Sequence, residues 1–437
     1  MMNVGKPSAV DHSGRREIVI FGVTGVTGQI VFENALSRFQ GSEVAVAGRS
    51  KAKIEKVIAE SVKINPSYEG EAKDVLLLEA DVANYKSLVA MCKSARLVLN
   101  CVGPFRFYGE EVVKAALEAK THYMDVSGEP HFLELIEAKW SDEARREGVW
   151  VVGSCAFDSI PADVGLMHFK HEFPGELTGV ESYLKFEPGP SGYIANDGTW
   201  QSAIHGFANQ GQLKALRKSQ GLEPVKYYGP RLPNRGAFFR DPKLGYCIPF
   251  MGSDASVVLR TQRHLALRER SDPIRFRPYA VIGGVFNLIL MMLFGSIFSL
   301  FAKYSITRRL LQKYPRFFSC GCFSKGGPTR KQMSEASFAV YFKGQGFVSS
   351  FERDQKKQPT VHATSVFRGP DAAYIGTSII FLEAALCLLK EPDNMPNEGG
   401  VYTPGIAFRD TTLIERLRGC GFQIELVSSS EDESSDA

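Results

Sequence analysis

The sequence lacks a strong charge of either sign, and this absence narrows the classes of protein to consider. Its 437 residues carry 52 basic and 48 acidic side chains, which gives a formal net charge of +4. A nucleic-acid-binding protein usually carries a strong positive field, so no nucleic-acid partner is expected. The length is sufficient for roughly two or three domains, each with a core of its own.

Motifs for metal and disulfide chemistry are also missing. The eight cysteines form no CxxC pair, and the close pair Cys320 and Cys322 has no further ligand at metal-binding spacing. No HExxH motif occurs among the eight histidines, so we predict reduced thiols and no catalytic metal. No apolar leader or myristoylation glycine stands at the start, and Pro66 blocks the sequon-like triplet 65–67. We therefore expect a cytosol-facing, unglycosylated protein.

Strand-like and helix-like patterns alternate along the first third of the chain. The stretches 28–39 and 110–120 carry apolar residues on one face, which predicts helices between β-rich runs. This alternation predicts a parallel sheet with helices on both faces, joined by right-handed crossovers. The predicted strands are 17–21, 43–47, 75–79, 95–101, 122–126 and 149–153.

A glycine-rich loop, FGVTGVTG, joins the first predicted strand to the first predicted helix. In a dinucleotide-binding fold, Gly22 would allow the tight turn, Gly25 would let the backbone approach a pyrophosphate, and Gly28 would let helix and sheet pack. Backbone NH groups at the helix start would then hold the phosphates. Taken alone, the motif fits a purely structural turn equally well. With its context, it predicts cofactor contacts from Gly22, Thr24, Gly25, Val26, Thr27 and Gly28.

Three further strand ends point to the same crevice, because ligands of open α/β sheets bind at the carboxyl ends of strands. Arg49 stands where an NAD-specific fold carries an acidic residue and suits a 2′-phosphate, so NADP is favoured over NAD. A solvated arginine at a strand end is the alternative. Asp81 could contact the adenine ring or, as an alternative, act as a helix cap before Asn84. The fourth strand ends in small residues that leave room for a flat cofactor, namely Cys101, Val102 and Gly103.

Together these motifs resemble the saccharopine dehydrogenase-like oxidoreductases. The resemblance rests on GVTGVTG, AGRS, NCVGPF with the helix after it, GSCAFDSIPADVG, and a C-terminal segment that contains YTPGIAF. It implies a Rossmann-type doubly wound parallel sheet, a second α/β domain with a mixed sheet, and a returning C-terminal segment. Similar mycobacterial-type members are trans-acting enoyl reductases of lipid synthesis. The GxxGxxG loop and a long apolar insertion distinguish this chain from the lysine-metabolism enzymes, so the substrate stays open.

The patterns and the resemblance divide the chain into five predicted segments. They are a flexible start (1–14), the dinucleotide-binding domain (15–165), the second α/β domain (166–400), the returning segment (401–427) and a disordered, acidic, serine-rich tail (428–437).

Candidate catalytic residues are few, because a nicotinamide performs hydride transfer itself. Asp125 and Cys155 stand near strand ends where the nicotinamide should rest, and either could act as a proton donor. Structural roles explain such residues as well, for example a small buried hydrophobe for Cys155. The same segments contribute Tyr123, Ser127, Glu129 and Asp158.

The stretch 278–302 contains no charged residue. As one helix it would measure roughly 35–40 Å, enough to cross a hydrocarbon core of about 30 Å. Basic residues flank both ends, and a returning C-terminal segment would keep both flanks in one compartment, which opposes a simple crossing. We therefore predict a hairpin or shallow insertion, bent near Gly283–Gly284 or Gly295, whose flanking arginines meet anionic headgroups. A buried helix of the soluble core is the alternative.

These observations lead to one functional hypothesis and one alternative. The hypothesis is an NADP(H)-dependent oxidoreductase that acts on a hydrophobic or lipid-linked substrate. Segment 278–302 would attach it to lipid droplets and to cytosol-facing membranes, those of the endoplasmic reticulum first and mitochondria second. The alternative is a scaffold at the same surface that keeps the dinucleotide-binding fold without turnover. A homodimer is compatible with either.

Overall fold

The computed structural model of the protein describes residues 14–355 and 358–431 and divides the chain into two compact units. Unit 1 comprises the described residues up to Phe157 together with Ala373–Leu413. Unit 2 comprises Asp158–Ala372 and the described residues from Ile414 onwards. The first boundary thus precedes residue 165, and the segment that returns to unit 1 is 373–413, whereas 401–427 was expected.

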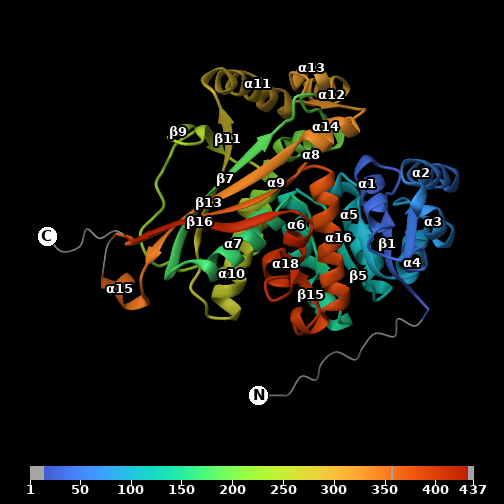
Figure 1. Ribbon diagram of the computed structural model, residues 1–437, viewed down its shortest axis with the longest axis horizontal. Helices are drawn as coiled ribbons and strands as arrows, with labels where there is room; N and C mark the ends of the chain where they lie inside the picture. Colours follow the sequence, from blue (N-terminus) through green and yellow to red (C-terminus); the bar gives the residue numbers. More distant parts are fainter. Residues whose placement is uncertain (1–13, 356–357, 432–437) are drawn as a thin grey trace. The chain divides into compact units, whose positions relative to one another are not determined.

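Unit 1 is built on a seven-stranded parallel sheet with the strand order β15-β6-β5-β4-β1-β2-β3. Figure 1 labels β1, β5 and β15 of this sheet and several helices of the same unit. Its central strands are buried along most of their length, which is why they appear in the sequence as continuous apolar runs. The strands are β1 (Arg16–Phe21), β2 (Val44–Gly48), β3 (Leu76–Glu79), β4 (Ala95–Asn100), β5 (His122–Asp125), β6 (Trp150–Val152) and β15 (Gly400–Tyr402).

Helices connect these strands, and α16 from the returning segment packs against α1. Asn34 donates a hydrogen bond to Ser378 Oγ at 2.8 Å, and Arg38 Nε pairs with Glu383 Oε1 at 2.8 Å. The helices of unit 1 are α1 (Val26–Ala35), α2 (Lys51–Ile64), α3 (Glu69–Asp74), α4 (Tyr85–Lys93), α5 (Phe105–Glu118), α6 (Pro130–Glu147), α16 (Ile375–Lys390) and α17 (Pro404–Ala407).

Unit 2 contains a seven-stranded mixed sheet with the order β16-β14-β13-β7-β11-β10-β9. Only β7 and β11 run parallel within it, and the other neighbours are antiparallel. Helices α7 (Ile160–Glu172) and α10 (Asp254–Arg268) pack against this sheet. The strands are β7 (Glu176–Glu187), β9 (Phe239–Asp241), β10 (Gly245–Pro249), β11 (Arg275–Gly283), β13 (Ser337–Phe347), β14 (Val361–Pro370) and β16 (Gln423–Glu431).

A group of helices in unit 2 has its own small apolar cluster. Trp200, Ile204, Ala302 and Leu311 are buried in it, and partly buried phenylalanines pack around them. Its members are α8 (Asp197–Ala208), α11 (Val285–Lys303), α12 (Ser305–Lys313), α13 (Pro315–Phe318) and the short strands β8 (Ala195–Asn196) and β12 (Phe323–Ser324). Elsewhere in unit 2 lie α9 (Gln210–Ser219), α14 (Arg330–Glu335) and α15 (Ser350–Gln355), while α18 (Leu413–Gly419) precedes β16.

The apolar stretch 278–302 is not one helix, which corrects the prediction for its first part. Residues up to Gly283 belong to β11, because they pair with β7 on one side and β10 on the other. The chain turns at Gly283, whose φ of +81° suits glycine, and α11 begins at Val285. The change of direction therefore lies at one of the two predicted glycine sites, and α11 continues through Gly295 without a break.

The acidic tail also begins later than predicted. Residues 428–431 belong to β16, which pairs antiparallel with β14, with Ser428 opposite Thr364. The available edge of β14 explains this, because a serine-rich segment can form backbone hydrogen bonds with an open strand. Residues 432–437 of the predicted tail, and residues 1–13 of the predicted flexible start, lie outside the described residues.

Candidate cofactor-binding site

The glycine loop lies between β1 and α1, and two of its glycines are required by the fold itself. Gly22 has a φ of +89°, and a Cβ there would lie 2.7 Å from Val102 Cγ2. At Gly28, a Cβ would lie 2.2 Å from the carbonyl oxygen of Gly22. Helix α1 can therefore approach the end of β1 only because neither residue carries a side chain.

Gly25 differs, because the protein around it leaves room for a side chain. A Cβ there would meet only the Gly22 carbonyl oxygen, at an ordinary 3.4 Å, and its φ of −82° is open to any residue. Gly25 is the N-cap of α1, and as a glycine it has no side chain to accept a hydrogen bond from this helix start. The NH groups of the first turn, contributed by Val26, Thr27 and Gly28, thus form a cradle that fits a phosphate.

Arg49 lies at the end of β2 and is exposed to solvent. Helix α2 starts directly after it, with Ser50 as an N-cap whose side chain makes no capping hydrogen bond. Lys51 and Lys53 follow in the first turn, and the NH of Lys51 donates to Glu79 Oε1 at 3.1 Å. Two further cations at a helix start therefore accompany Arg49. Our sequence reasoning missed them, although the motif GRSKAK contains both.

Asp81 follows β3 and makes a local turn. Its Oδ1 accepts a hydrogen bond from the NH of Ala83 at 3.0 Å, while Asn84 caps α4 through the NH of Ser87 at 3.3 Å. The helix cap considered for Asp81 is thus supplied by Asn84, and Asp81 makes the turn before it, while the adenine contact stays a prediction.

The end of β4 is held by buried polar side chains. Asn100 accepts from the NH of Val102 at 2.9 Å and donates to the hydroxyl of Tyr123 at 3.0 Å. Cys101 donates its NH to the carbonyl of Phe21 at 2.9 Å, which ties this end to the glycine loop. Val102 and Gly103 follow, so the structure brings the predicted β4 residues beside the loop of β1.

Glu129 has a structural role that the sequence did not indicate. Its two carboxylate oxygens accept hydrogen bonds from the NH groups of Phe105 at 2.9 Å and Arg106 at 3.1 Å. These groups belong to the first turn of α5, so Glu129 caps that helix from a distant part of the chain.

Asp125 lies at the end of β5 and joins the loops after β5 and β6. Its Oδ1 accepts from the NH groups of Ser127 and Ser154, both at 2.9 Å. Burial raises the pKa of Asp125 to about 6, and the two backbone hydrogen bonds oppose this rise. The carboxylate thus fixes the backbone of the loops after β5 and β6.

Cys155 is completely buried next to Asp125. Its NH donates to the Asp125 carbonyl at 2.7 Å, and its thiol contacts the Val152 carbonyl at 3.1 Å. Burial, followed by the charge of Asp125, holds the pKa of the Cys155 thiol well above its ordinary value. A protonated, enclosed thiol matches the structural alternative considered for this residue.

Asp158 belongs to unit 2, whereas Asp125 and Cys155 belong to unit 1. Burial raises the pKa of Asp158 to about 6. Its neighbour Ser159 donates to Asp254 Oδ1 at 3.2 Å. Burial and then the charge of Asp158 raise the pKa of Asp254 to about 7. In the described residues no group of acids, histidines and cysteines could hold a metal ion.

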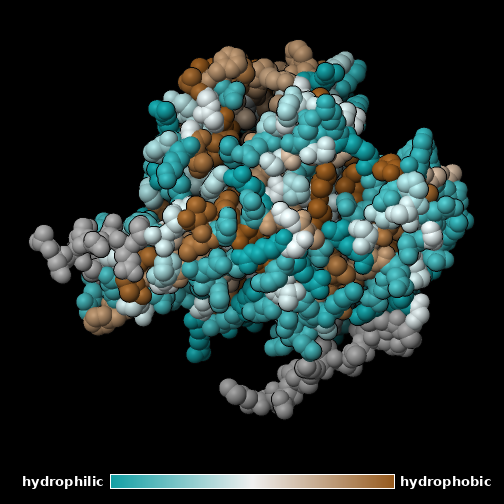
Figure 2. All heavy atoms as spheres, in the orientation of Figure 1, coloured by the Kyte–Doolittle hydropathy of each residue, from teal (hydrophilic) through white to brown (hydrophobic). Residues whose placement is uncertain are grey.

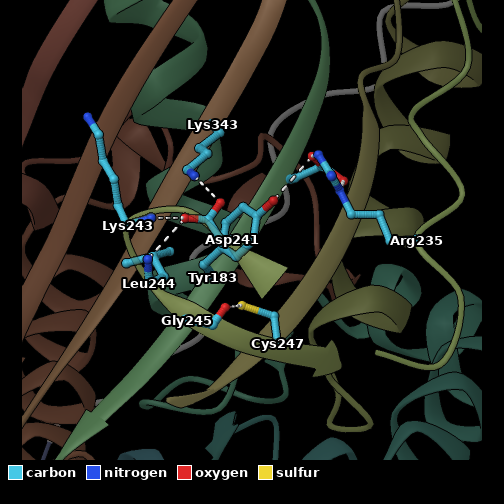
Figure 3. A network of polar contacts seen from close by, with 9 residues as sticks. Tyr183, Arg235, Asp241, Lys243, Leu244, Gly245, Cys247 and Lys343 are labelled. Carbon is cyan, nitrogen blue, oxygen red and sulfur yellow. Dashed lines mark hydrogen bonds and ion pairs between the residues drawn. The ribbon is translucent and has the colours of Figure 1, made fainter. Parts of the chain in front are cut away.

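Unit 2 also contains a polar network on its sheet that sequence reasoning missed (Figure 3). Arg235 binds Glu181 through two hydrogen bonds of 2.8 and 2.7 Å, and Tyr183 donates to Glu181 at 3.2 Å. Lys343 pairs with Asp241, which also accepts two backbone NH groups at 3.0 Å. Each charge has an opposite partner, so the network fixes the segment 235–244 on the sheet.

The comparisons with known proteins agree with this geometry. The family model of the saccharopine dehydrogenase NADP-binding domain matches residues 18–152. A human saccharopine dehydrogenase-like oxidoreductase is 43% identical over 422 residues, covering 95% of this chain and 98% of that protein. A Caenorhabditis elegans protein named "Lipid droplet localized protein" is 37% identical, covering 95% of this chain and 99% of that protein.

Among solved structures, saccharopine dehydrogenase (L-Glu forming) from Saccharomyces cerevisiae matches with a TM-score of 0.54 and 13% identity. The match covers 95% of this chain and 100% of that one, and at this identity it shows the fold alone. The family model shows that unit 1 carries an NADP-binding domain, and the glycine loop lies within the matched residues. The chain belongs to the saccharopine dehydrogenase-like oxidoreductases.

Proposed function

We propose that the protein is an NADP(H)-dependent oxidoreductase that acts on a hydrophobic or lipid-linked substrate at the surface of lipid droplets or membranes. Bound NADP(H) supplies the hydride chemistry, so the chain itself must bind, orient and shield the reactants. The first turn of α1 binds the pyrophosphate through backbone NH groups, with Gly25 giving it access. Arg49, with Lys51 beside it, binds the 2′-phosphate.

Asp125 has a positioning role in this proposal. By accepting hydrogen bonds from the loops after β5 and β6, it fixes the ends of two neighbouring parallel strands. These ends are where the nicotinamide of a doubly wound sheet lies. Cys155 contributes packing there, because its side chain is fully buried.

The exposed apolar surface of α11 is the observation that carries the lipid assignment. In the described residues, α11 is the one helix long and apolar enough to span a membrane, and only 17% of its most apolar window is buried. Phe286 is 69% exposed and Ile289 is 60% exposed. Figure 2 shows hydrophobic residues gathered over α11 at the top of the view. Such exposure argues against the buried-helix alternative.

Both flanks of α11 belong to unit 2, which favours a shallow insertion over a crossing. β11 before it pairs with β7, and α12 after it packs with α8 in the same helical group. A helix whose two ends are fixed to one folded unit cannot place these ends on opposite sides of a membrane. An element of about 28 Å lying in the interface can enter a phospholipid monolayer. The name of the worm relative supports lipid droplets as this surface.

Turnover is the experiment that separates this proposal from a scaffold. The purified full chain, with NADPH, is assayed against a panel of enoyl and carbonyl lipids in mixed micelles, and NADPH oxidation is recorded. We expect oxidation with at least one lipid class. Tight NADPH binding without turnover across the panel would contradict the enzymatic proposal and leave the scaffold at a lipid surface.

A further inference from the structure

Two exposed cysteines stand out in the helical group that contains α11. All eight cysteines lie in the described part of the chain, and none of them forms a disulfide. Six are buried or partly buried, and only Cys320 and Cys322 are exposed. Both thiols lie in unit 2, whereas the cofactor-binding residues described above lie in unit 1.

Aromatic side chains fix the loop of these cysteines beside α11. The loop runs from α13 to β12, and Phe318 and Phe323 stand at its two ends. The ring of Phe318 lies 5.6 Å from that of Phe301 near the end of α11. Phe323 lies 5.4 Å from Trp200, which lies 4.8 Å from Phe298 of α11. The two thiols therefore sit on a loop anchored to the last turns of the apolar helix.

The surface around this loop has the charge and hydrophobicity of a membrane-facing region. No acidic residue occurs from 273 to 334, whereas ten lysines and arginines do. Ile306 and Phe317, beyond the end of α11, are 77% and 75% exposed. A pocket of about 550 Å³ in this region is lined by cationic, aromatic and small residues, namely Lys313, Tyr314, Pro315, Arg316, Phe317, Ser324 and Lys325. Anionic headgroups fit such a surface.

Other uses of the thiol pair fit less well. Within the described ranges no cluster of metal-ligating side chains includes these cysteines. Although both residues are exposed, partial desolvation raises the pKa of each thiol, and for Cys320 the nearby Cys322 adds to the effect. Mostly protonated thiols are poor redox sensors and poor spontaneous nucleophiles. Modification of either thiol therefore requires a base that removes the thiol proton, and a modifying enzyme would provide this base.

We propose that Cys320 and Cys322 are a site of S-acylation by a long-chain fatty acid. Cysteines next to membrane-embedded segments are the usual acceptors of this modification. The cysteine sulfur bonds to the carbonyl carbon of a long-chain acyl-CoA, the bond from that carbon to the CoA sulfur breaks, and the thiol proton passes to the departing CoA. A membrane-bound acyltransferase supplies the base, and no oxidant or reductant is consumed.

S-acylation would convert a reversible attachment into a lasting one. Shallow insertion of α11 supplies the first signal, and stable anchoring generally requires a second, such as an acyl chain. The inference thus rests on the membrane attachment proposed above, and it adds a reversible chemical switch to that attachment.

The test uses the full chain expressed in animal cells, in four forms: wild type, Cys320→Ser, the double variant Cys320→Ser/Cys322→Ser, and the control Cys420→Ser. Thioesters are cleaved with hydroxylamine and the released thiols are labelled with a mass tag, while flotation of the same lysates measures membrane attachment. Urea unfolding of each purified form reports whether unit 2, which contains both cysteines, is folded. We expect tagged species in wild type and Cys420→Ser and none in the double variant. The fraction of the double variant that floats with membranes should be on the order of tenfold lower than that of wild type.

Two results would overturn the inference and separate it from the proposed attachment. Wild type that floats with membranes but shows no hydroxylamine-dependent tag would refute acylation and leave the attachment standing. A tag that persists in the double variant would place the acyl group elsewhere. Wild type that neither floats nor carries the tag would contradict both the attachment and the inference.

Discussion

Gly25→Val is the substitution that tests the cofactor site most selectively. A Cβ at residue 25 meets only the Gly22 carbonyl oxygen, at 3.4 Å, so the fold has room for it. Loss of glycine at this N-cap should cost about 1 kcal/mol of unfolding free energy at most. The branched side chain would instead occupy the space through which a pyrophosphate reaches the NH groups of α1. We expect NADPH affinity to fall by at least about 100-fold, or roughly 2.7 kcal/mol.

Gly28→Ala is the matched variant, because we expect it to lower the stability of unit 1, whereas Gly25→Val should lower NADPH affinity. Its Cβ would lie 2.2 Å from the Gly22 carbonyl oxygen, so the backbone must move and unit 1 should lose about 3 kcal/mol of stability. The assays are NADPH binding by fluorescence titration and unfolding by urea. Normal NADPH binding by a folded Gly25→Val protein would refute the reasoning, since the loop would then be only a turn.

Three further predictions concern the same unit and the surface helix. Arg49→Ala should weaken NADPH binding roughly tenfold to a hundredfold in titrations and leave NADH binding unchanged, because a charge-assisted contact with the 2′-phosphate is lost. Asp125→Asn should show a stability gain that grows between pH 4 and 6, because the folded pKa of about 6 exceeds the unfolded one and the ionised buried carboxylate is costly. At neutral pH the gain in urea unfolding should approach about 3 kcal/mol, and a pH-independent difference would contradict the assignment. Phe286→Glu/Ile289→Glu should abolish flotation with membranes while leaving unfolding nearly unchanged, because both side chains are exposed.

The sheet of unit 1 could be predicted because its strands are buried on both faces. A strand such as β2, with all its residues buried, appears in the sequence as a continuous apolar run between helical patterns. The glycine loop, Arg49 and the end of β4 were located by their positions after such strands. Connections made over long sequence distances were not predictable. Glu129 caps α5 across more than 20 residues, and no local pattern announces such a contact.

Unit 2 was less predictable for related physical reasons. The charge-free stretch 278–302 conceals a change from strand to helix, since apolar residues suit both β11 and α11. Only the pair Gly283–Gly284 marks the change, and from the sequence alone it predicts a bend in the inserted segment. Arg235 lies in an irregular segment without periodicity, so its pairing with Glu181 depends entirely on tertiary structure. Residues 428–431 likewise form a strand only because they pair with β14, which the local sequence does not indicate.

The central claim is that this NADP-binding chain reduces or oxidises a lipid at an interface, and one comparison tests it most directly. A lipid that supports NADPH oxidation is presented either in phospholipid-coated oil droplets or in detergent micelles to wild type and Phe286→Glu/Ile289→Glu. The account predicts equal rates in micelles and, for the variant, a loss on droplets of about tenfold or more. Equal rates of both proteins on droplets would contradict it.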